Sequence, residues 1–142
     1  MELVGLQDDY VHDGRVLFEV LQPSALPASL NTQSQTLLQL AQVYKQIHAT
    51  VGQLGRDSLT VSTAALASNS ADDEVYNRLE EKIGAWHARR DFIAHQMRGL
   101  LEGAAFGNQP VGDEQAKRLI RQGLALMQEI SSCAANPSVC AQ

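Results

Sequence analysis

Hydrophobic residues recur every three or four positions along much of this chain, and the first such stretch follows Thr32. Polar residues, chiefly glutamines, separate its apolar positions, which are Leu37, Leu40, Tyr44, Ile47, Val51 and Leu54. This spacing places the apolar side chains on one face of an amphipathic α-helix. Thr32 and Gln35 match a capping box, in which two side chains satisfy free backbone N–H groups at a helix start.

Glycines interrupt this first helix near its end. Gly52 and Gly55 weaken it, because glycine loses more backbone freedom than other residues when it becomes helical. Asp57 can then cap a short second helix. This second piece is expected to carry Leu59, Val61, Ala64, Ala65 and Leu66.

A long amphipathic helix is predicted after a run of turn-forming residues at 68–73. Its apolar positions are Leu79, Ile83, Trp86, Ile93, Met97 and Leu100. Arg90 occupies the one polar position on this stripe. Asp72, Asp73 and Glu74 lie in the first turn, where the helix dipole favours anions. Glycines and Pro110 mark the end of the helix.

The last predicted helix begins near Asp113 and Glu114, which can pair with Lys117 and Arg118 one turn later. Its apolar face is formed by Ala116, Leu119, Ile120, Gly123, Met127 and Ile130. Because each amphipathic segment has one apolar face, the segments can bury these faces only against one another. We therefore predict an all-α fold, an antiparallel helical hairpin or bundle of three to four amphipathic helices, over residues 28–131.

An irregular segment, residues 1–27, is expected before the bundle, since Pro23 and Pro27 exclude a continuous helix there. A flexible tail, residues 132–142, is expected after it.

The tail contains the two cysteines, Cys133 and Cys140. The proline between them makes a small disulfide loop geometrically reasonable, and two free thiols are the alternative. A disulfide would indicate an extracytoplasmic chain, periplasmic or secreted; without it the chain is expected to be cytoplasmic.

The composition is typical of one helical domain, and it argues against nucleic acids and membranes as partners. The chain has 142 residues, of which 44% are hydrophobic and 19% charged, and its net charge is −5. We expect no nucleic-acid partner, because no basic face with interleaved aromatic residues is present. We expect no membrane partner, because no apolar run approaches the roughly 20 residues that span a bilayer.

Residues of the types that catalyse reactions or bind metals occur in small groups, and these groups do not form a catalytic motif. Asp8, Asp9, His12 and Asp13 could hold a divalent cation. The favoured interpretation is a solvated acidic loop, because Asp13 precedes a glycine and reads as a turn.

The other residues that could act in catalysis or binding are interpreted as having structural roles. Solvated or rim positions are expected for three histidines on predicted helices, His48, His87 and His95. An ion-paired surface patch is expected for Arg89, Arg90 and Asp91. The hydroxyl-rich segment 57–63 lacks the Gly-x-Ser-x-Gly elbow of serine hydrolases. No residue is therefore assigned to catalysis, to a cofactor or to a metal.

The start of the chain resembles the closing segment of the catalytic domain in the alkaline phosphatase superfamily. Sulfatases and type I phosphodiesterases end that domain with a phrase similar to LxGL…DGRxL…L, and residues 3–6, 13–17 and 21 follow this order. The resemblance covers residues 1–21. In that family the metal ligands and the nucleophile lie upstream of the phrase, so none is carried onto this chain. The resemblance implies the C-terminal portion of a metal-dependent phosphoesterase or related hydrolase.

Two functions follow, from different classes of protein. In the first, the chain is a non-catalytic C-terminal helical region that packs on, covers or oligomerises a catalytic domain encoded upstream. In the second, it is an independent helical interaction protein that self-assembles. We expect no enzyme activity from the chain alone in either case. We also expect self-association, most simply a symmetric dimer, because residues 1–21 are rich in apolar side chains that need a covering surface.

Overall fold

The structure is a computed structural model that describes residues 22–25, 28, 34–67 and 73–140. Its elements in chain order are η3 Pro23–Ala25, α2 Ser34–His48, α3 Gln53–Leu66, α4 Glu74–Phe106, α5 Asp113–Ala135 and α6 Pro137–Cys140. All elements of regular secondary structure in this part of the chain are helices, so the predicted all-α fold is confirmed. The predictions for residues 1–21, for the cap at Thr32 and for Asp72 in the first turn of the long helix lie outside the described residues. Asp73 is the N-cap residue of α4, so Glu74 but not Asp73 lies in the first turn as predicted.

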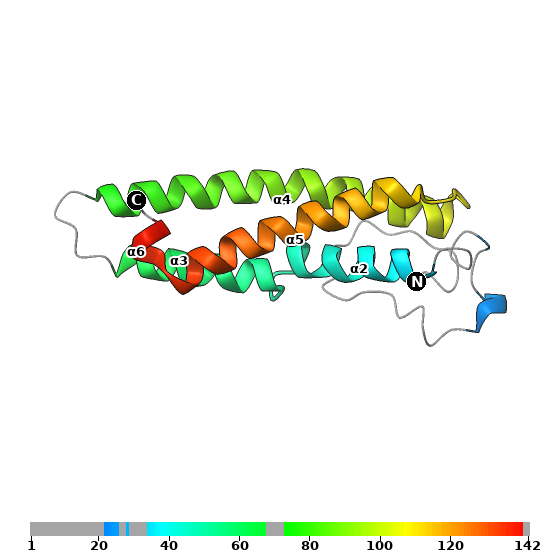
Figure 1. Cartoon of the computed structure of the whole chain (residues 1–142), viewed down its shortest axis with the longest axis horizontal. Helices are drawn as coiled ribbons and strands as arrows, with labels where there is room; N and C mark the ends of the chain where they lie inside the picture. The colour runs from blue at the N-terminus through cyan, green and yellow to red at the C-terminus, as the bar shows by residue number, and fades with distance from the viewer. Residues whose placement is uncertain (1–21, 26–27, 29–33, 68–72, 141–142) are drawn as a thin grey trace.

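The helices form an up-down-up bundle (Figure 1). α2 and α3 follow each other along one side, α4 runs back beside both of them, and α5 returns across the molecule. Both α2 and α3 pack against α4 and against α5. The bundle therefore has three long helices, the first of which is broken into two pieces, as the predicted antiparallel bundle requires.

The apolar faces of these helices meet in one continuous core. Its largest fully buried side chains are Leu37, Leu40, Ile47, Leu54, Leu79, Met97, Leu119, Leu126, Ile130 and Val61. Most of them are positions that the spacing predicted, because burying one apolar face is the main source of helix stability in a bundle. Trp86 is only 3% exposed, which confirms its place on the stripe of α4.

Three large apolar residues of the predicted helices, one of them on a predicted stripe, are exposed. Val51 is 68% exposed, because α2 ends at His48 and Val51 lies in the turn that follows. Leu59 and Leu66 belong to α3 but face away from the core. The buried side of α3 is formed by Leu54, Ser58, Val61 and Ala65.

The break between α2 and α3 depends on two glycines. A Cβ atom on Gly52 would lie 2.5 Å from the carbonyl oxygen of Gln46, and one on Gly55 would lie 2.4 Å from that of Thr50. Both contacts are with backbone atoms, which a larger residue could not push aside without moving the turn. The side chain of Gln46 also accepts a hydrogen bond from the backbone N–H of Gln53, at 3.0 Å. These contacts fix the start of α3.

Two predicted boundaries are corrected by the structure. Asp57 does not cap a second helix, because α3 already begins at Gln53 and Asp57 lies inside it. α5 does not end at residue 131 but continues to Ala135, and α6 follows. The longer helix brings Cys133 into the core, which accounts for its extension into the segment predicted as a tail.

Candidate functional site

The face of α4 that points away from the core carries a second regular pattern. Its members, here called the outer stripe of α4, alternate three and four residues apart and are Ala85, Ala88, Phe92, His95 and Gly99. All of them are exposed, and Phe92 is 69% exposed. A Cβ atom on Gly99 would meet no atom within 4 Å, so there is open space beside this end of the stripe. It contains no carboxylate, ammonium or guanidinium group.

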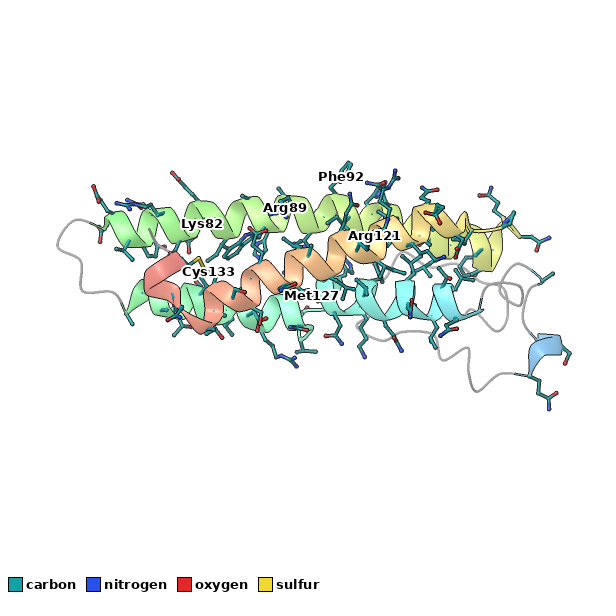
Figure 2. The ribbon with its side chains drawn as sticks, viewed as in Figure 1. Lys82, Arg89, Phe92, Arg121, Met127 and Cys133 are labelled. Carbon is teal, nitrogen blue, oxygen red and sulfur yellow. A yellow bond between two sulfur atoms is a disulfide. The ribbon has the colours of Figure 1, made fainter. Side chains whose placement is uncertain are left out.

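An open groove of about 480 Å³ lies between α4 and α5 beside this stripe. Its lining residues are Ala88, Arg89, Phe92, Ile93, Gln122 and Ala125. Figure 2 shows Phe92 and Arg89 on α4, with Arg121 on the neighbouring helix α5. The groove and the outer stripe share Ala88 and Phe92, so together they form one continuous surface, with the ion-paired Arg89 beside it.

A polar link joins α4 and α5 at the edge of this groove. The indole N–H of Trp86 donates to Glu129 Oε1 at 2.7 Å, and Arg89 Nη1 donates to Glu129 Oε2 at 2.7 Å. Partial burial raises the pKa of Glu129, but the two hydrogen bonds and the charge of Arg89 outweigh it and leave this pKa below its ordinary value. The carboxylate of Glu129 therefore holds the two helices together in its ionised form.

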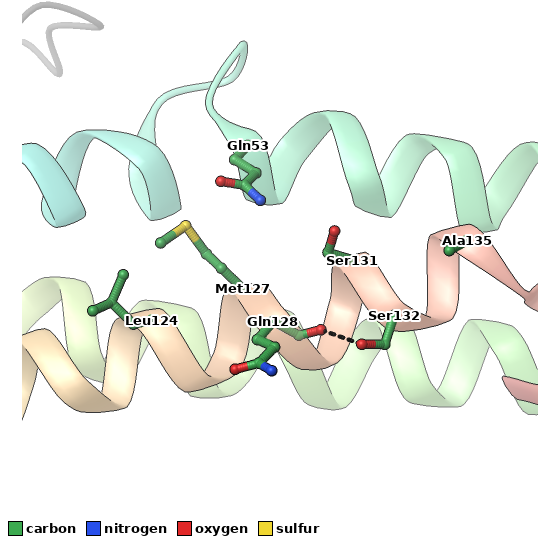
Figure 3. Close-up of a pocket in the computed structure, with 7 residues that line it drawn as sticks. All are labelled: Gln53, Leu124, Met127, Gln128, Ser131, Ser132 and Ala135. Carbon is green, nitrogen blue, oxygen red and sulfur yellow. Dashed lines mark hydrogen bonds between the residues drawn. The ribbon is translucent and has the colours of Figure 1, made fainter.

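A second groove, of about 540 Å³, lies between α5 and the start of α3. Figure 3 shows Met127 pointing toward the break between α2 and α3, with Gln53 opposite. Leu124 lines the same groove and is 49% exposed. The hydroxyl of Ser132 donates to the carbonyl of Gln128 at 2.8 Å, so it is used within α5.

The C-terminal end of the bundle is closed by a disulfide between Cys133 and Cys140, whose Cα atoms are 5.2 Å apart. Figure 2 draws this bond near Lys82 of α4. The Nζ atom of Lys82 donates a hydrogen bond to the carbonyl oxygen of Cys140. Of the two alternatives that the sequence allowed, the structure contains the disulfide.

The acidic cluster Asp8, Asp9, His12 and Asp13 lies outside the described residues, and the three histidines on the helices differ in exposure. His95 is exposed, as predicted. His48 is partly buried, and its ring stacks on Tyr44 with centroids 5.0 Å apart. His87 is also partly buried; burial and the charge of Arg90 lower its pKa. Among the residues that the structure describes, no group of three His, Cys, Asp or Glu side chains could hold a metal ion.

The arginine patch is ion-paired, as predicted, but one of its partners is different. Arg90 Nε lies 2.7 Å from Asp91 Oδ1, and this pair satisfies an arginine that is only partly exposed. Arg89 pairs across the bundle with Glu129 rather than within the patch.

The hydroxyl-rich segment 57–63 lies inside α3. Thr60 and Thr63 donate to backbone carbonyls one turn earlier, at 3.1 and 2.8 Å. Their hydroxyls are therefore used in the ordinary way within a helix.

Sequence reasoning missed the outer stripe of α4, although its spacing could have been found. The alternation of three and four residues is present in the sequence, but alanine and glycine contribute little to a hydrophobic pattern and Phe92 is its single large apolar member. The link from Trp86 and Arg89 to Glu129 carries no local signal, because it depends on how two distant helices align.

None of the helices in the described ranges is long and apolar enough to cross a bilayer. No protein family model matches the chain, and no curated protein or solved structure matches it either.

Proposed function

We propose that this chain is the non-catalytic C-terminal helical region of an alkaline-phosphatase-like phosphoesterase, and that the outer stripe of α4 packs against the catalytic domain. The exposed Phe92 within that stripe is the observation that carries the proposal. A helix in a bundle needs one apolar face, and the opposite face of α4 already supplies it. On the outer face, small uncharged residues flank Phe92, so its ring is an apolar anchor that another body can reach and cover.

The chemistry of the stripe suits this role. Alanine and glycine let another element approach the α4 backbone closely, while Phe92 supplies a large apolar anchor of the kind that dominates binding energy in interfaces. Arg89, beside the groove, lies at the rim, where charged groups stay in contact with water. The resemblance of residues 1–21 to a closing catalytic segment supports the choice of occupant.

The first test is to read the coding frame upstream of Met1, which is expected to continue into Asp-, His- and Thr- or Ser-bearing motifs. In the extended protein, Phe92→Glu should uncouple the helical region from the catalytic domain, so that calorimetry shows two unfolding transitions instead of one. Leu59→Glu, at an equally exposed apolar residue of α3, is the matched control and should leave one transition. A stop codon and a ribosome-binding signal just before Met1 would reject the proposal.

The 142-residue chain alone is expected to hydrolyse neither phosphomonoesters, phosphodiesters nor sulfate esters. The resemblance places the metal ligands and the nucleophile upstream, and this chemistry needs both. Metal-dependent turnover of an aryl phosphate or sulfate, lost when Asp8, Asp9 or His12 is replaced, would contradict this expectation.

Self-assembly is the second candidate function, and the alternation of three and four residues in the outer stripe favours it. That spacing suits the pairing of two α4 helices from two copies of the chain. Light scattering should then find a dimer that Phe92→Glu converts to a monomer. Deleting residues 1–27 tests whether the N-terminal segment contributes to the dimer, while a monomeric wild-type chain would reject the candidate.

The disulfide supports an oxidising compartment, periplasmic or extracellular, as the place where the chain works. Mass spectrometry of the protein from its native source, alkylated before lysis, tests this. Free thiols at both cysteines would contradict it.

A further inference from the structure

The two sulfurs of the disulfide differ in how easily a reagent can reach them. Cys133 belongs to α5 and is 5% exposed, whereas Cys140, at the end of α6, is partly exposed. In thiol–disulfide exchange an incoming thiolate attacks one sulfur and displaces the other, so access decides which sulfur reacts. Cys140 is therefore the more accessible of the two cysteines.

A cation lies beside this sulfur. The Nζ atom of Lys82 is 4.0 Å from Cys140 Sγ, and its hydrogen bond to the Cys140 carbonyl holds it there. One turn earlier on α4, Arg78 is occupied by Glu74 at 2.7 Å. Glu129, whose carboxylate the charge of Lys82 also stabilises, is hydrogen-bonded by Trp86 and Arg89. The ammonium group of Lys82 thus makes the surroundings of Cys140 Sγ favourable for an anion.

We propose that Cys140 is a site of thiol–disulfide exchange for small anionic thiols, and that Lys82 draws them to it. The incoming thiolate attacks Cys140 Sγ, a new S–S bond forms, and the bond to Cys133 Sγ breaks. Cys133 leaves as a thiolate and takes a proton from water. A second thiolate then attacks the sulfur of the first reagent and releases Cys140, so two thiol molecules supply the two electrons and leave as their own disulfide.

Exchange at Cys140 removes the side-chain cross-link between α6 and α5, which then remain joined only by the backbone through Asn136. α6 then retains its packing against α3 and its hydrogen bond from Lys82, which are weaker constraints than the S–S bond. The reaction changes the end of the bundle without touching the outer stripe of α4, so the inference stands independently of the proposed function.

The test compares three small thiols of different charge on the full oxidised chain: mercaptoethanesulfonate, mercaptoethanol and cysteamine. Mass spectrometry after an acid quench locates the mixed disulfide and measures initial rates. Each rate is divided by the rate at which the same thiol attacks a small uncharged disulfide under the same conditions, which removes differences in thiolate fraction and in nucleophilicity. The mixed disulfide is expected on Cys140. The anionic thiol should react about fivefold faster than the cationic one at low salt, and this preference should shrink in about 1 M salt.

Lys82→Met is expected to remove the preference for the anionic thiol. Lys117→Met is the matched control, because it removes the same charge near the start of α5, where Lys117 pairs with Asp113. It should leave the preference unchanged, and circular dichroism confirms that both variants fold. A mixed disulfide on Cys133, equal normalised rates for the three thiols, or an undiminished preference in Lys82→Met would each overturn the proposal.

Discussion

Trp86 combines apolar burial with a polar link at a single residue. Its ring lies in the core, while its indole N–H reaches Glu129 of α5. A buried tryptophan normally finds such a partner, because an unsatisfied N–H in the core costs free energy. The residue therefore fixes the alignment of α4 and α5 as well as filling space between them.

Replacing Trp86 with alanine is expected to lower the free energy of unfolding by about 3 kcal/mol, the usual scale for emptying a large aromatic side chain from a core. Urea denaturation followed by circular dichroism measures the loss. Phe92→Ala, on the exposed face of the same helix, is the control and should change stability by less than about 0.5 kcal/mol. Trp86 is the only tryptophan, so native emission typical of a solvated indole would contradict its burial.

Gly123 lies where α5 packs closely against α2 and α4. A Cβ atom there would lie 2.6 Å from Val43 Cγ1 and 3.2 Å from Met97 Cε. Gly123→Ala should therefore destabilise the chain by about 1–3 kcal/mol through overpacking. Gly84→Ala is the control, because its Cβ would meet nothing within 4 Å, and it should stabilise the chain by up to about 1 kcal/mol. Thermal unfolding of both variants gives the comparison, and the same sign for both would refute it.

At the scale of helices, apolar spacing predicted which faces of α2, α4 and α5 pack together. It could not predict where α3 begins, because that boundary depends on backbone oxygens around Gly52. It could not decide between a disulfide and free thiols, because the choice depends on how Cys140 folds back beside Cys133. Pairing of Arg89 with Glu129 likewise requires the alignment of two helices that are distant in sequence.

The link between α4 and α5 is expected to make the bundle sensitive to acid. Because the pKa of Glu129 is lower in the folded chain than its ordinary value of 4.5, its contribution to stability is complete above that pH. The contribution is lost as pH falls through the lower folded value. Glu129→Gln should therefore reduce stability at neutral pH and flatten its decline below about pH 4.5. Urea titrations at a series of pH values measure this, with Glu81→Gln on the exposed face of α4 as the control.

At the scale of the whole molecule, each end of the bundle is held together by its own contacts between helices that are distant in sequence. At one end, the hydroxyl of Thr36 in α2 donates to Asp113 of α5 at 2.9 Å. At the other end, α6 packs against α3, and Lys82 of α4 reaches Cys140. The disulfide lies at this second end, so covalent reinforcement is confined to the half of the bundle that contains α3.

The break at Gly52 has a dynamic consequence. Because the hydrogen-bond ladders of α2 and α3 are separate, α2 can open locally while α3, α4 and α5 stay folded, which is how subglobal unfolding units arise. Amide hydrogen exchange should show faster exchange in α2 than in the middle of α5. Reducing the disulfide should accelerate exchange in α3 and leave α2 unchanged. Equal protection across α2 and α3 in both redox states would mean that the bundle opens as one cooperative unit instead.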